Sequence, residues 1–169
     1  MKSTILIALM PLLAPTTATV LCDKLTSVKS NIATLTQTFS GNVSDQNSLY
    51  VAYRNLNAAT STLNDLEHEI TSTTSAINGA SSTLSNLDIQ TGCWLGWLTN
   101  LESGLEQVSS DLSSLSNKGG QDLMNGNVHN VQSYQPQIKN YANSAAKDLD
   151  GANSALSTLN QYNDDVNCW

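Results

Sequence analysis

The stretch WLGWLTNLESGLEQVSSDLSSL, residues 94–115, decides the fold class of this 169-residue chain. Its apolar side chains recur in alternating steps of four and three residues: Trp94, Leu98, Leu101, Leu105, Val108, Leu112 and Leu115. This spacing places side chains on one face of an α-helix, whereas a half-buried strand needs alternation at every second residue. The stretch therefore predicts a long amphipathic helix, and Asn117-Lys118-Gly119-Gly120 is expected to end it.

Apolar stripes of the same kind run through residues 25–39, 49–84 and 137–167. In the second of these, large apolar residues stand seven positions apart, which is the repeat of packed helices. The residues interleaved between them are Tyr53 and Thr60. Pro136 is expected to open the last helix, because its fixed φ suits the first helical position.

Loops are expected between these stripes, at residues 40–46, 88–93 and 117–136, and a fifth short helix at residues 121–132. Loops let the chain fold back on itself, which favours a bundle over one long dimeric coiled coil. We therefore predict an all-α fold, an antiparallel four- or five-helix bundle with heptad-like apolar seams.

Residues 1–18 have the features of a secretory signal peptide. A positive Lys2 precedes a short apolar run and then the small residues that signal peptidase reads. Pro11 and Pro15 are expected to interrupt a helix here, which argues against a buried N-terminal helix. We expect the mature protein to be residues 19–169, a single soluble and exported domain. No later segment is apolar enough to predict a transmembrane helix.

Three cysteines are expected at one pole of the bundle. Cys22 precedes the first predicted helix, Cys93 precedes the third and Cys168 follows the last. Disulfides form in the oxidising environment that secreted proteins meet. A Cys22–Cys168 bridge would join the two ends of the mature chain, and Cys93–Cys168 is the alternative pairing. Either pairing leaves one cysteine free, buried or available to another chain.

Charge and motif content argue against several functions. Seven basic residues face 14 acidic ones, and a net charge of −7 repels phosphate backbones, so nucleic acid is not an expected partner. His68 and His129 lack the ligand spacing of a zinc site. No nucleophile elbow or phosphate-binding loop occurs. We expect no catalytic residue, no metal and no cofactor, and hence no enzyme.

Residues 92–98 carry two tryptophans and two leucines at the predicted cysteine pole. One interpretation is that Trp94 fills the end of the core and Trp97 is partly exposed. The other is an apolar patch that contacts a lipid or a hydrophobic surface. The residues expected to form that contact are Trp94, Leu95, Trp97, Leu98 and Leu101.

Asn42-Val43-Ser44 is the one N-glycosylation sequon in the chain, and it falls in the first predicted loop. Acceptor asparagines lie in exposed segments, so Asn42 is the candidate glycosylation residue. The sequon by itself leaves its occupancy open.

A signal followed by Leu25-Thr26-Ser27-Val28 through Leu35-Thr36-Gln37-Thr38-Phe39-Ser40-Gly41 resembles the opening of the hydrophobic surface-binding protein A family of fungal cell-wall mannoproteins. The apolar repeat at residues 98–115 and the Ala/Leu-rich last helix are similar in order and length. The resemblance implies a secreted helical bundle that adsorbs to hydrophobic surfaces, as members do, some with fatty acids between their helices. The three cysteines and the Trp-rich segment depart from the family's largely cysteine-free pattern.

These observations predict a secreted, non-enzymatic protein, extracellular or associated with a cell wall. We expect it to bind a lipid or fatty acid or to adsorb to hydrophobic surfaces. The alternative is a secreted effector or structural wall component that binds a host or cell-wall protein through its hydroxyl-rich helix faces.

Overall fold

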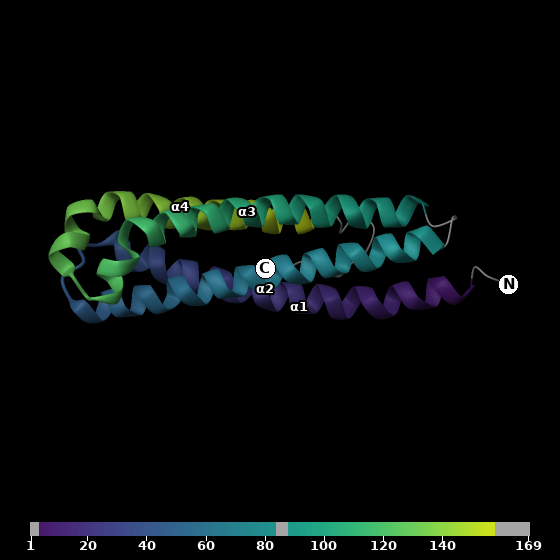
Figure 1. Ribbon diagram of the computed structural model, residues 1–169, viewed down its shortest axis with the longest axis horizontal. Helices are drawn as coiled ribbons and strands as arrows, with labels where there is room; N and C mark the ends of the chain where they lie inside the picture. The colour runs from purple at the N-terminus through teal and green to yellow at the C-terminus, as the bar shows by residue number, and fades with distance from the viewer. Residues whose placement is uncertain (1–3, 84–87, 158–169) are drawn as a thin grey trace.

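The computed structural model is an elongated all-helical bundle (Figure 1). It describes the backbone of residues 4–83 and 88–157, and the side chains of residues 20–79 and 95–154 except Trp97. These parts of the chain contain four helices and no strand. The helices are α1 (Thr4–Ser40), α2 (Gln46–Thr83), α3 (Asp88–Met124) and α4 (Val128–Ser157).

The helices lie side by side along the long axis of the molecule (Figure 1). The α1–α2 connection, residues 41–45, and the α3–α4 connection, residues 125–127, lie at the same end. We call this the loop end. α4 finishes at Ser157, well short of the opposite end that α1, α2 and α3 reach. Among the described elements, that opposite end is therefore built by three helices, with α3 beginning there.

The core consists of one row of apolar side chains from each helix, as the predicted stripes of α1, α3 and α4 require. The fully buried residues include Leu25, Val28, Ile32, Leu35 and Phe39 of α1, Leu98, Leu101, Leu105, Val108, Leu112 and Leu115 of α3, and Ile138, Ala142, Ala145 and Leu149 of α4. Their burial is the main favourable contribution to folding, because apolar area leaves water.

The interleaved residues of α2 differ from the prediction. Tyr53 and Thr60 are only half-buried, and the positions that alternate with the buried leucines are held by Ala52, Ala59 and Leu66. Alanine is small enough for a neighbouring helix to approach at these positions. The predicted row of Leu49, Leu56, Leu63 and Ile70 is buried, but the sequence interpretation favoured the larger side chains between them and so placed two of the interleaved positions one residue too late.

The predicted end of the third helix at Asn117-Lys118-Gly119-Gly120 is wrong, because α3 continues to Met124. Gly119 is instead buried against α4, where a Cβ atom would stand 2.5 Å from Ile138 Cδ1. The absence of a side chain allows this close approach of the two helices.

The chain turns away from α3 at Gly126, two residues after Met124, where φ is 64°. The Asn127 N–H donates to the Asp122 carbonyl (2.9 Å) and the Gly126 N–H donates to the Leu123 carbonyl (3.2 Å). This is the hydrogen-bond pattern of a Schellman motif, which needs a left-handed residue at this position. Glycine takes that conformation without steric cost.

α4 begins much earlier than predicted, so there is no long loop at 117–136 and no separate fifth helix at 121–132. Its first turn is capped by Asn127, whose Oδ1 accepts a hydrogen bond from the Asn130 N–H (3.4 Å). Pro136 lies inside α4 and is exposed, so its ring faces solvent and displaces no packed side chain. The cap, and not the proline, therefore determines where this helix starts.

Two further boundaries differ from the sequence prediction. Residues 88–93 are the first turns of α3 and not a loop, so Cys93 lies inside that helix. α1 starts at Thr4 and passes through Pro11 and Pro15, so Cys22 also lies within a helix. The two prolines are four residues apart and share one helix face, which confines their missing N–H donors to one side of α1. None of the helices, within the described residues, is long and apolar enough to cross a membrane.

Candidate functional site

The predicted apolar site lies at the start of α3. Leu98 and Leu101 are core residues, exposed by 1% and 0%, whereas Leu95, one turn earlier, is only half-buried. On the neighbouring helix α2, Ile77 is likewise half-buried against the core. The side chains of Trp94 and Trp97 lie outside the described residues. Ile77 belongs to the apolar row of α2, so the cover of that row is less complete here, whereas Leu95 lies beside the row of α3, at the heptad position of the half-buried Glu102 and Ser109.

Three large exposed apolar side chains occur elsewhere in the described residues, and two of them do not add to this site. Among the described residues they are Val20, Tyr50 and Met124, each about 40% exposed. Tyr50 and Met124 lie near the loop end, because Tyr50 Oη stands 2.9 Å from the place where a Cβ of Gly126 would be. They are at the far end of the bundle from Leu95.

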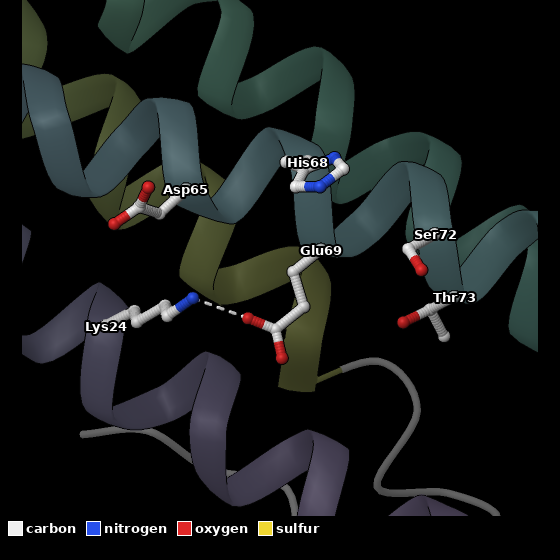
Figure 2. Close-up of a pocket in the computed structure, with 6 residues that line it drawn as sticks. All are labelled: Lys24, Asp65, His68, Glu69, Ser72 and Thr73. Atoms are coloured by element: carbon white, nitrogen blue, oxygen red, sulfur yellow. Dashed lines mark hydrogen bonds and ion pairs between the residues drawn. The ribbon is translucent and has the colours of Figure 1, made fainter.

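A shallow polar groove of about 390 Å³ lies between α1 and α2 (Figure 2). Its lining residues are Lys24 from α1 and Asp65, His68, Glu69, Ser72 and Thr73 from α2. Lys24 Nζ donates to Glu69 Oε2 at 2.6 Å, and both side chains are about 30% exposed. An ion pair this accessible adds at most about 1 kcal/mol to stability, and its main effect is to align the two helices.

The groove offers no recognisable catalytic arrangement. His68 is exposed, and the Lys24–Glu69 pair engages the nearest opposite charges of the two helices. The described part of the chain contains no group of three or more His, Cys, Asp or Glu side chains able to hold a metal ion. The Lys24–Glu69 contact could not be found from the sequence, because 45 residues separate its partners.

A pair of carboxyl groups faces across the α3–α4 interface. Burial raises the pKa of Asp111, and the nearby charge of Asp148 and a hydrogen bond with it raise the pKa further. Asp111 Oδ2 is buried and makes no hydrogen bond with any residue that the structure describes. Both causes disfavour the ionised form of Asp111 in the folded protein. No sequence motif indicates the pair, since 37 positions separate the two residues.

The raised pKa of Asp111 predicts that the contribution of this residue to stability is more favourable in acid than at neutral pH. Because the folded state holds the pKa of Asp111 above the ordinary value of 3.8, it binds more protons than the unfolded chain between the two values. Stability is therefore lost as the pH rises through the raised pKa. We expect Asp111→Asn to raise the melting temperature at pH 7 and to leave it nearly unchanged below pH 3.8.

Thermal unfolding followed by circular dichroism at several pH values measures this effect. The exposed Glu106→Gln on the same helix is the matched control for removing one negative charge. Equal shifts for both variants, or a shift of Asp111→Asn that does not depend on pH, would contradict a raised pKa of Asp111 in the folded protein.

The α3–α4 connection is held by a second polar group. The Tyr134 hydroxyl donates to Asp122 Oδ2 at 2.6 Å, and Asn130 Nδ2 donates to Asp122 Oδ1 at 3.2 Å. These hydrogen bonds lower the pKa of Asp122, while burial and the same carboxylate raise the pKa of Tyr134. Lys118 Nζ lies 5.2 Å from the centre of the Tyr134 ring. The group joins the last turn of α3 to the start of α4.

The remaining predicted residues have the following places. Asn42 is exposed in the connection between α1 and α2. Cys22 is half-buried in α1, and the side chains of Cys93 and Cys168 lie outside the described residues, so the disulfide pairing stays a prediction. Comparisons of this chain with family models, curated proteins and solved structures found no match.

Proposed function

We propose that this protein is a secreted, non-enzymatic helical bundle that binds a lipid or fatty acid, or adsorbs to a hydrophobic surface, through the end where α3 begins. The half-burial of Leu95 is the observation that supports this most. Leu98 and Leu101 lie on the same helix, one and two turns further along, and are fully buried. In this proposal the site lies at the end of the described core.

The described part of α4 ends at Ser157, so of the two helices that α3 packs against, α2 alone is described beside the first turns of α3 (Figure 1). Apolar side chains left partly in water gain free energy when a lipid or an apolar surface covers them, at about 25 cal/mol for each Å². In this proposal Leu95, Trp94 and Trp97 form the contact, and Leu98 and Leu101 form the core beneath it.

The same proposal includes a finer description of the fold. We take the bundle to be antiparallel with heptad-like seams, supported by buried residues at steps of three and four in every helix and by connections of only five and three residues. We also take residues 1–18 as a signal that is removed on export. The charge and residue pattern of that segment support this.

Adsorption to an alkyl-coated sensor and to fatty-acid-containing vesicles tests the site. We expect Trp97→Ala and Leu95→Ser each to weaken adsorption at least about tenfold, because covering one large apolar side chain is worth about 1.5–3 kcal/mol. Tyr50→Ala is the matched control, since it removes an exposed aromatic side chain near the loop end.

Native mass spectrometry of the secreted protein, followed by solvent extraction, shows whether it carries a lipid. Adsorption that survives both Trp97→Ala and Leu95→Ser would contradict this site. A wild-type protein that neither adsorbs nor carries lipid would contradict the proposed function and favour a protein partner.

A further inference from the structure

Exposed and buried residues alternate in the middle of the connection between α1 and α2. Asn42 and Ser44 are exposed, whereas Val43 between them is 3% exposed and belongs to the core. Val43 therefore anchors the segment, and its two neighbours face away from the core. These three residues are also the single Asn-x-Ser sequon of the chain.

Two glutamines of α4 hold the backbone of this connection. The Val43 N–H donates to Gln135 Oε1 at 3.3 Å, and Gln132 Nε2 donates to the Val43 carbonyl at 2.7 Å. Gln135 Nε2 also donates to the carbonyls of Phe39 (3.4 Å) and Gly41. The polar backbone groups on both sides of Asn42 are thus satisfied from α4. The fold of the connection makes no use of the Asn42 amide.

The space around Asn42 is open. Its side chain makes no hydrogen bond with any residue that the structure describes, and the flanking Gly41, Asp45 and Gln46 are exposed as well. A Cβ atom built on Gly41 would meet nothing within 4 Å. A large group on Asn42 Nδ2 would therefore extend into solvent without disturbing the core or the glutamine contacts.

From this geometry we propose that Asn42 carries an N-linked glycan at the loop end of the bundle. In the transfer, Asn42 Nδ2 bonds to the anomeric carbon of an oligosaccharide linked to a lipid diphosphate. The bond from that carbon to the diphosphate oxygen breaks, the diphosphate leaves with the electron pair, and the amide loses one proton. The folded protein then bears carbohydrate at the end opposite the start of α3 (Figure 1). If the proposed function also holds, an adsorbed molecule presents its carbohydrate away from the surface.

Expression of the full chain through the secretory pathway of a eukaryotic cell tests this site. We expect the intact mass to exceed the mass of the expected mature chain, residues 19–169. Peptide N-glycosidase should remove the excess and leave aspartate at position 42. Asn42→Gln and Ser44→Ala should each abolish the excess, and Ser44→Thr should retain it. Asn47→Gln is the matched control, because this exposed asparagine lies five residues away outside any sequon.

The proposal would be overturned if excess mass were absent both from the wild-type chain and from a second protein in which a known cleavable signal precedes residue 19. An enzyme-sensitive excess that survives in both Asn42→Gln and Ser44→Ala would also overturn it. The second protein separates glycosylation from the export prediction. If only that protein gains the glycan, the glycosylation site stands and the signal at residues 1–18 fails. Neither outcome depends on lipid or surface binding.

Discussion

Replacing Phe39 with alanine is expected to lower the free energy of unfolding by about 3–5 kcal/mol, the usual cost of deleting a buried aromatic ring. Phe39 is the largest fully buried side chain among the described residues, with 0% exposure, and the single phenylalanine of the chain. It lies in the last turn of α1, where Gln135 also binds its carbonyl. The hydrogen bonds from α4 hold this end in place, so the surroundings are poorly able to collapse into the cavity.

Urea unfolding followed by circular dichroism measures the loss, provided that the slope of free energy against urea stays constant. Met124→Ala is the control, because this large apolar side chain is 41% exposed at the same end of the molecule. We expect it to change stability by no more than about 0.5 kcal/mol. Similar losses for both variants would mean that the row of buried residues does not extend to the end of α1.

Replacing Gly104 with alanine is expected to destabilise the protein by about 1–3 kcal/mol, the cost of overpacking a filled interface. A Cβ on Gly104 would stand 2.8 Å from Ala152 Cβ and 3.1 Å from Ala152 Cα. Since one of these atoms is backbone, α3 and α4 would have to separate. Alanine otherwise favours a helix over glycine by about 1 kcal/mol, so a net loss measures the closeness of the two helices.

Gly151→Ala on α4 is the matched control, because nothing lies within 4 Å of the added Cβ. It should stabilise the protein by about 0.5–1 kcal/mol through helix propensity alone. Gly119→Ala should fall between the two, since its added Cβ meets the movable end of Ile138. If Gly104→Ala stabilised the protein, α3 and α4 would not approach as described. If they do approach, adding Ala152→Gly to Gly104→Ala should restore part of the lost stability.

The polar contacts illustrate what sequence reasoning misses. Gln135 binds the α1–α2 connection, 94 positions away in the chain, and Lys24 binds Glu69, 45 positions away. Asp111 of α3 faces Asp148 of α4. Each of these side chains occurs among many similar ones in a chain rich in polar residues. Nothing in local spacing distinguishes the partner from its neighbours, because the pairing depends on the register between helices.

The candidate site likewise combines features that the sequence predicts with features that it does not. The apolar spacing correctly assigned Leu98 and Leu101 to the core, since helical period alone selects the buried face. Leu95 lies beside this row and is half-buried, as are Glu102 and Ser109 at the same heptad position. The sequon identified Asn42, whereas the reason its amide is left unused lies in two glutamines of a distant helix.

The sequence by itself determined the helical class, most of the buried residues and the connection after Ser40, because the period of three and four residues and its interruption are local properties. Only the tertiary structure decided where the other helices end. Gly119 resembles a helix end but fills a close contact between α3 and α4, while Gly126 supplies the left-handed turn. A glycine permits both a tight interface and a positive φ, and the choice between them is made by what packs against it.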